Sequence, residues 1–133
     1  MYTLVELILL SAAVDGHIDE AEKSSILKSF AQHRDVPSIS EGQISAIKQQ
    51  LLERLQQGFT HEGVIQNAAH ALTEDKRILS YAIAVEVVLS NNELTKSERE
   101  YLKLHRETLK LDKKQVESIH FSAKVRYGFG EFN

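Results

Sequence analysis

The chain has 133 residues, 42% of them hydrophobic and 26% charged, with a net charge of −3, one proline and no cysteine. This length fits a single domain over residues 1–133, and the absence of cysteine excludes disulfides, thiolate catalysis and iron–sulfur clusters. The slight acidic excess argues against a nucleic-acid partner, because proteins that bind the phosphate backbone usually carry a basic surplus.

Two apolar runs, Leu4 to Val14 and Ile78 to Leu89, are too short for a membrane-spanning helix, which needs about 20 residues. The first run contains Glu6 and follows no basic segment, unlike a signal peptide. We therefore expect two buried helices of a cytoplasmic domain without a membrane span. The second run should lie at the centre, because a helix that is apolar on most sides is covered by others, and the first run should pack against it.

Signals for helix starts separate the predicted elements. A capping residue followed three positions later by Glu, the capping-box spacing, occurs at Asp19, Ser38 and Thr95. Further candidate N-caps are Thr60, Thr73 and Asp112. Between these starts, apolar residues recur every three or four positions, as in amphipathic helices. The pattern predicts an all-α bundle of about seven helices, near residues 2–14, 19–34, 40–57, 60–72, 74–90, 95–109 and 113–127.

The end of the chain is basic and then aromatic. Its last residues, Tyr127-Gly128-Phe129-Gly130-Glu131-Phe132-Asn133, are interpreted as a tail whose rings pack back on the domain. The alternative is a segment for self-association or for a partner. The preceding basic residues are interpreted as a solvated face, with an acidic partner as the alternative, and they are Lys110, Lys113, Lys114, Lys124 and Arg126.

One helix–turn–helix unit occurs twice in the sequence. Residues 13–22 align with residues 89–98, and in both an apolar helix leads into a short polar turn that opens the next helix. The matched positions are Asp15 and Asn91, Gly16 and Asn92, Ile18 and Leu94, Asp19 and Thr95, and Glu22 and Glu98. Gly and Asn tolerate the left-handed conformation that often ends a helix. The repeat predicts two pseudo-symmetric units in one domain.

The first turn resembles the second half of a calcium-binding EF-hand loop. With Gly16 at loop position 6, Asp15, Asp19 and Glu22 take ligand positions 5, 9 and 12. The first half of the loop fails, because positions 1 and 3 fall in the predicted first helix. Two interpretations stand: a carboxylate cluster for Ca²⁺ or Mg²⁺, or helix caps and turn residues without a metal. The candidate metal ligands of the two turns are Asp15, Asp19, Glu22, Glu93 and Glu98.

The motif Asp15-Gly16-His17-Ile18-Asp19-x-x-Glu22, with Asn92-Glu93-Leu94-Thr95-x-x-Glu98 later in the chain, resembles the TerB-like (tellurite resistance) domain. That family has two acidic turns, each opening a helix, in an all-helical fold. The resemblance implies a compact all-α domain, a metal-associated acidic surface, a role in bacterial stress or metal-ion response, and no established enzymatic activity. The chain departs from the family at Asn91-Asn92, where the family usually has Asp-Gly.

We therefore expect a non-enzymatic, TerB-like binding module that engages a protein partner or a second copy of itself, with a divalent cation at the acidic turn. Two alternatives stand. One is a structural or interaction domain whose acidic turns only cap helices; the other is a hydrolase that activates water with a carboxylate-bound metal. The six histidines contain no pair four residues apart and do not predict a zinc site. Among them, His70 is expected to be a partly buried packing residue, since alanines and Leu72 surround it in the sequence.

Overall fold

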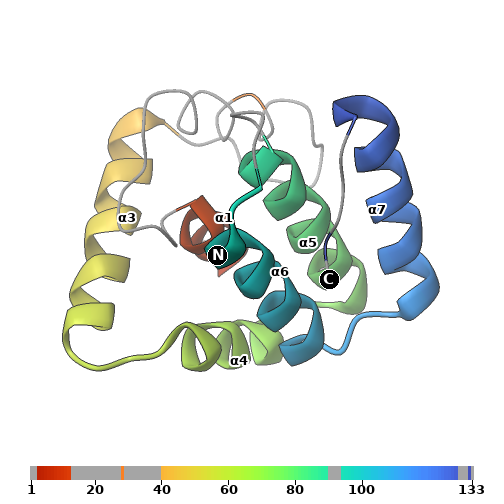
Figure 1. Ribbon diagram of the computed structural model, residues 1–133. Coiled ribbons are helices and arrows are strands. Elements are labelled where there is room, and N and C mark those ends of the chain that lie inside the picture. The colour runs from red at the N-terminus through yellow and green to blue at the C-terminus, as the bar shows by residue number, and fades with distance from the viewer. Residues whose placement is uncertain (1–2, 13–27, 29–39, 90–93, 129–131, 133) are drawn as a thin grey trace.

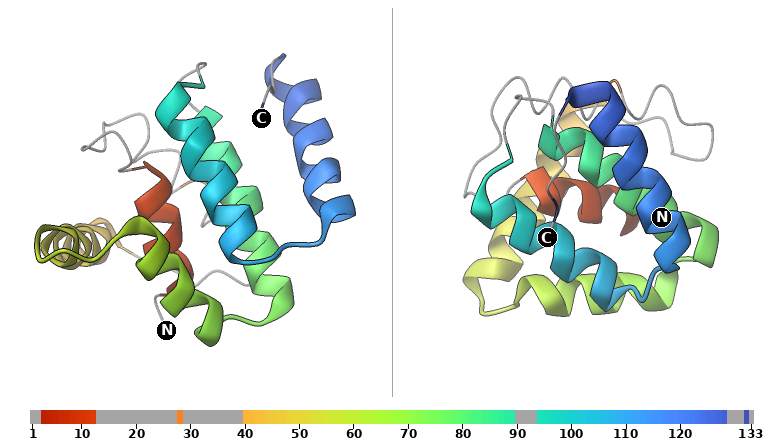
Figure 2. Two further views of the ribbon diagram at one scale, coloured as in Figure 1. Left: turned by 60° about the horizontal axis from the view of Figure 1, so that its bottom comes forward. Right: turned by 45° about the vertical axis from the view of Figure 1, so that its right-hand side comes forward.

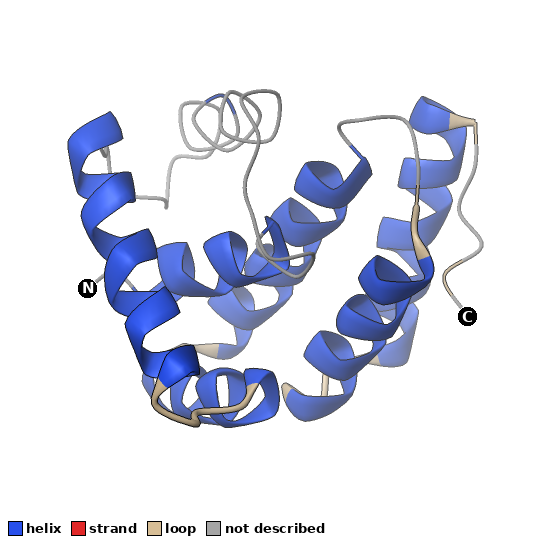
Figure 3. Ribbon diagram, turned by 60° about the vertical axis from the view of Figure 1, so that its left-hand side comes forward, coloured by secondary structure: helices blue, strands red, loops and turns tan. Residues whose placement is uncertain are grey.

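The computed structural model describes residues 3–12, 28, 40–89, 94–128 and 132. These residues form helices joined by loops, with no strand among them (Figure 1 and Figure 3). The helices are α1 (Thr3–Ala12), α3 (Glu41–Gln56), α4 (His61–Ala71), α5 (Glu74–Val88), α6 (Lys96–Thr108) and α7 (Lys113–Tyr127). The all-α prediction is confirmed for this part of the chain, and each helix lies within two residues of its predicted bounds. The helix expected at residues 19–34 lies outside the described residues.

Helix α1 is buried on every side. Leu7, Ile8, Leu9 and Leu10 are completely inaccessible, and the helix lies in the middle of the bundle (Figure 1). Burial of each such side chain is worth about 1.5–3 kcal/mol relative to exposure. Its most extensive packing is against α5, with α3, α4 and α6 covering its other sides. The predicted pairing of these two apolar helices is confirmed.

Helix α5 is the second central element. Its buried residues are Ser80, Tyr81, Ile83, Ala84, Val85, Val87 and Val88. They occupy nearly every side of the helix, so α5 contacts α1, α6 and α7. Among the residues that the structure describes, no helix combines the length and apolar character needed to cross a bilayer.

The predicted helix caps are confirmed at four starts. Each cap side chain accepts a hydrogen bond from a backbone N–H three residues later, and the pairs are Thr60 with Gly63, Thr73 with Lys76, Thr95 with Glu98, and Asp112 with Gln115. Each such cap is worth about 1 kcal/mol. Ser38 lies outside the described residues, and α3 is capped by Ser40, whose hydroxyl accepts from the backbone N–H of Gln43 and whose own N–H donates to the Gln43 side chain. This later box starts the helix at Glu41.

Helix α7 stands apart from α6 and packs chiefly on α5. A tight turn joins α6 to α7, and in it Lys110 adopts a left-handed conformation, with φ of 55°. Its N–H and that of Leu111 bond to the carbonyls of Glu107 and Arg106, which closes the end of α6 in a Schellman motif. Figure 2 shows α7 (blue) set apart from α6 (cyan), with the short connection between them at one end.

Candidate functional site

A groove separates α6 from α7. Its cavity measures about 380 Å³, which lies within the usual range for ligand pockets, and it has apolar side chains between charged ones. The lining residues are Arg106, Glu107, Lys110, Leu111, Lys113, Val116, Glu117 and His120. We call this cavity, together with the adjoining position of Phe132, the α6–α7 groove.

Phe132 is held at this groove although it is the penultimate residue of the chain. Its side chain is only 3% exposed, and its ring stacks on the ring of His120, with centroids 4.1 Å apart and planes 8° from parallel. Its backbone carbonyl accepts a hydrogen bond from Arg106 Nη2 at 3.4 Å. The prediction that the tail packs its rings on the domain is therefore confirmed for Phe132.

Tyr81 joins α5 to both sides of the groove. Its hydroxyl lies 2.7 Å from His120 Nε2 on α7 and accepts a hydrogen bond from Arg106 Nη1 on α6 at 3.2 Å. A guanidinium can only donate, so the Tyr81 hydroxyl accepts from Arg106 and keeps its own proton available for His120 Nε2. When His120 is neutral and protonated at Nδ1, its Nε2 accepts this proton, and the imidazole that stacks on Phe132 is uncharged.

The surroundings of His120 reinforce this neutral form. Burial and the positive charge of Arg106 together lower the pKa of His120 to about 4. Burial also raises the pKa of Tyr81, although the nearby Arg106 charge opposes that shift. At neutral pH, the imidazole of His120 is consequently uncharged.

A second polar pair, Ser80 and His105, lies in the core where α5 meets α6. Both residues are completely buried, and Ser80 Oγ is 3.0 Å from His105 Nε2. The Ser80 hydroxyl donates its only proton to the carbonyl of Arg77 at 2.6 Å, so His105 must donate from Nε2. His105 Nδ1 is then an acceptor, and it has no hydrogen-bond partner within the described part of the chain. Burial lowers the pKa of His105 to about 3.

This pair has the spacing of a serine–histidine dyad but the opposite proton arrangement. A nucleophilic serine must give its proton to histidine, whereas Ser80 gives its proton to a backbone carbonyl. Both side chains are also closed off from solvent. The pair therefore belongs to the packing of α5 on α6. Edge-to-face contacts of the His105 ring with Tyr81 and Tyr101, at 5.5 Å and 5.8 Å, extend that packing.

Two other hollows, of about 240 Å³ and 360 Å³, adjoin Arg77 and the α6–α7 turn. The guanidinium of Arg77 donates to the carbonyls of Ala69 and Leu72, so it closes the end of α4. Because the Arg77 guanidinium is already hydrogen-bonded to these carbonyls, it is less available to a ligand in either hollow than the cations of the α6–α7 groove are.

Most of the predicted metal ligands fall outside the described residues, namely Asp15, Asp19, Glu22 and Glu93. The fifth, Glu98, is 4% exposed, and its carboxylate accepts a hydrogen bond from the backbone N–H of Thr95 at 2.9 Å. The predicted capping box at Thr95 is thus confirmed. In the described ranges, no three His, Asp or Glu side chains gather in a way that could hold a metal ion.

The sequence interpretation missed His105 and His120 as site residues. His105 lies four residues after Tyr101 and four before Leu109, both buried, so its place in the apolar pattern of α6 was the available signal. His120 follows Val116 by four positions in the same way. The expectation for His70 is wrong, because the buried side of α4 passes through Ala68 and leaves His70 exposed.

No known protein family, curated protein or solved structure matches this chain. The function of the α6–α7 groove is therefore inferred from its own residues and contacts.

Proposed function

We propose that the chain is a non-enzymatic binding module that holds a segment of a partner protein in the α6–α7 groove. The observation that carries the proposal is the burial of Phe132 against His120, with its carbonyl bonded to Arg106. An aromatic side chain in a pocket supplies affinity, and a hydrogen bond to the peptide backbone fixes orientation. The groove thus has the two elements of peptide recognition.

The proton arrangement around the groove favours binding over catalysis. His120 is neutral and its Nε2 atom is hydrogen-bonded to the Tyr81 hydroxyl, so this atom is engaged within the protein. Ser80 and His105 are engaged with Arg77 and with each other. The contacts of Tyr81 with His120 and Arg106 fix both sides of the groove, and fixed walls lower the entropy lost when a segment binds.

The proposal is tested by emptying the groove and refilling it from solution. In full-length Phe132→Ala, a synthetic peptide of residues 128–133 should bind with a dissociation constant of about 0.1–1 mM, as measured by calorimetry. The natural chain should bind the same peptide at least about tenfold more weakly, because its own tail competes at a high effective concentration.

The control is the same peptide with alanine in place of its second phenylalanine, which should not bind. The proposal fails if folded Phe132→Ala protein releases no heat with the phenylalanine peptide at millimolar concentration. Circular dichroism of the variant checks that it remains folded.

A second copy of this chain is one candidate partner, because its own tail brings the same groups to the groove. Exchange of tails between two copies would produce a dimer. Light scattering should then report a doubled mass that Phe132→Ala abolishes, and a monomer at high concentration would contradict this form of the proposal.

A divalent cation at the first acidic turn is proposed on the sequence alone. The carboxylates of Asp15, Asp19 and Glu22, spaced as in half of a calcium loop, support Ca²⁺ or Mg²⁺ as the ligand. The resemblance to TerB-like domains, and with it a role in bacterial stress or metal-ion response, supports the same proposal. Glu93 and Glu98 are the corresponding carboxylates of the second turn.

The cation is tested by thermal unfolding after treatment with a chelator. Addition of Ca²⁺ or Mg²⁺ should raise Tm, because a ligand that binds only the folded state stabilises it by about 2.7 kcal/mol at a hundred times its dissociation constant. The double variant Asp15→Asn/Asp19→Asn should lose this response. A natural chain whose Tm does not move at millimolar metal would show that the acidic turns serve only as caps.

A further inference from the structure

Positive charge is concentrated in the helices that form the α6–α7 groove. Residues 94–128 contain nine Lys and Arg against five Asp and Glu, whereas the rest of the chain contains seven against fourteen. A protein whose net charge is −3 therefore has a cationic region around its groove. Such segregation attracts partners of opposite charge and speeds their encounter.

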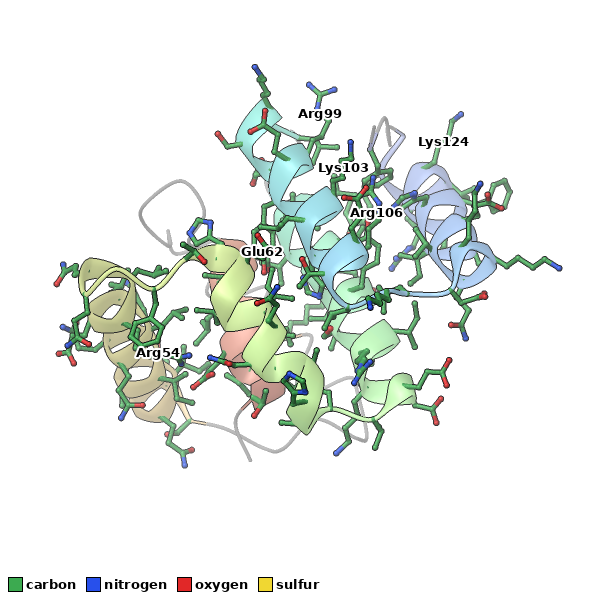
Figure 4. The ribbon with its side chains drawn as sticks, turned by 90° about the horizontal axis from the view of Figure 1, so that it is seen from below. Arg54, Glu62, Arg99, Lys103, Arg106 and Lys124 are labelled. Carbon is green, nitrogen blue, oxygen red and sulfur yellow. The ribbon has the colours of Figure 1, made fainter. Side chains whose placement is uncertain are left out.

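The cations are arranged along the groove. Arg99, Lys103 and Arg106 follow one another at helical spacings of four and three, so they share one face of α6. Arg106 contacts Tyr81 and Phe132, which shows that this face turns toward the groove. Figure 4 shows these three side chains along α6, with Lys124 on α7 across from them.

Three of these cations, Arg99, Lys103 and Lys124, have no carboxylate partner in the described ranges. The salt bridges there join Arg54 to Glu6, Lys96 to Glu100, and Arg126 to Glu86. None of them involves Arg99, Lys103 or Lys124. The uncompensated charge along the groove is therefore open to an acidic ligand.

Charges of both signs line the cavity itself. Arg106, Lys110 and Lys113 bring three cations, against the carboxylates of Glu107 and Glu117. The balance is positive here as well, and the apolar surface of the groove lies between these charges. This combination fits a ligand that carries an aromatic ring and negative groups together.

We propose that the α6–α7 groove selects partner segments in which an aromatic residue is flanked by acidic residues. This inference rests on the proposed function above and adds the chemistry of the partner. The aromatic ring takes the position of Phe132 on His120, and the acidic flanks face Arg99 and Lys103. The chain's own tail has one acidic flank of this kind, because Glu131 precedes Phe132 in the sequence.

The test uses full-length Phe132→Ala and three five-residue peptides with blocked ends: Asp-Glu-Phe-Glu-Asp, the neutral Asn-Gln-Phe-Gln-Asn, and the ring-free Asp-Glu-Ala-Glu-Asp. At low salt, the acidic aromatic peptide should bind about tenfold more tightly than the neutral one. This ratio should shrink as salt screens the charges. The ring-free peptide should bind weakly or not at all.

A charge reversal locates the effect. Lys103→Glu should weaken the acidic aromatic peptide about fivefold and leave the neutral peptide unchanged. The matched control is Lys76→Glu, which makes the same charge change at an exposed position on α5 that does not line the groove. It should alter neither affinity by more than about twofold.

Three outcomes would overturn the inference, and they are distinguishable. Equal binding of the acidic and neutral aromatic peptides removes the preference for acidic flanks but leaves the aromatic groove of the proposed function intact. Equal binding of the two acidic peptides, with and without the ring, indicates general attraction of polyanions such as nucleic acid. Failure of every aromatic peptide to bind contradicts the proposed function itself.

Discussion

Replacing Tyr81 with alanine is expected to lower the free energy of unfolding by about 3–5 kcal/mol, as for other large aromatic residues in protein cores. Tyr81 is completely buried on α5 and contacts the rings of His105 and His120. Its removal leaves a cavity between the central helix and both walls of the groove. Since a domain of this size is stable by only about 5–15 kcal/mol, this loss is a large part of the total.

Tyr81→Phe removes the hydroxyl but keeps the ring, so it measures the contribution of the hydroxyl to stability on its own. It should cost about 1–3 kcal/mol, because His120 Nε2 loses its hydrogen-bond partner and Arg106 loses an acceptor in a partly buried place. The matched control is Tyr127→Phe, which changes a half-buried tyrosine whose hydroxyl has no hydrogen bond within the described residues and should cost less than about 0.5 kcal/mol. Urea denaturation followed by circular dichroism measures all three variants. Equal stability of Tyr81→Phe and the natural chain would contradict the network at the groove.

Acidification from pH 6.5 to pH 5 is expected to destabilise the protein by about 2 kcal/mol through His105 alone. An unfolded histidine takes up a proton near pH 6.5, whereas the folded His105 stays neutral until about pH 3. Below pH 6.5 the unfolded chain therefore binds more protons, and stability falls as the pH falls. Above pH 6.5 both states are neutral at this residue and the effect vanishes. His120, with a pKa lowered to about 4, acts in the same direction with a smaller effect because it is half-exposed.

His105→Gln isolates this contribution, since glutamine retains an N–H donor for Ser80 and does not titrate. The variant should lose stability less steeply between pH 6.5 and pH 5, by up to about 1.4 kcal/mol per pH unit. His70→Gln is the matched control, because His70 is exposed, and its slope should equal that of the natural chain. Identical slopes for His105→Gln and the natural chain would show that His105 titrates normally in the folded protein.

The helices were predictable because local signals set them. Thr95 with Glu98, and Asp112 with Gln115, start α6 and α7 through contacts that span only three residues. The Ser40 box of α3 was not predicted, because Glu41 points to Ser38 as the capping residue, whereas Gln43 completes the box for Ser40. Burial of α1 and α5 followed from their apolar character on all sides.

The groove was not predictable in the same way. Its contacts join residues that are far apart in the sequence. Tyr81 lies 25 residues before Arg106 and 39 before His120, and Arg106 lies 26 residues before Phe132. Such distances depend on how whole helices pack, and no short motif encodes them. The aromatic tail was visible in the sequence, but not the imidazole on which it stacks.

The central claim is that the groove takes an aromatic ring at His120, and the ring protons of His120 report this most directly. In a nuclear magnetic resonance titration of full-length Phe132→Ala with the peptide of residues 128–133, we expect these protons to move upfield as the peptide phenylalanine stacks on the imidazole. At saturation they should approach their positions in the natural chain. His120 protons that are the same in the natural chain and in Phe132→Ala, and that do not respond to the peptide, would contradict the claim.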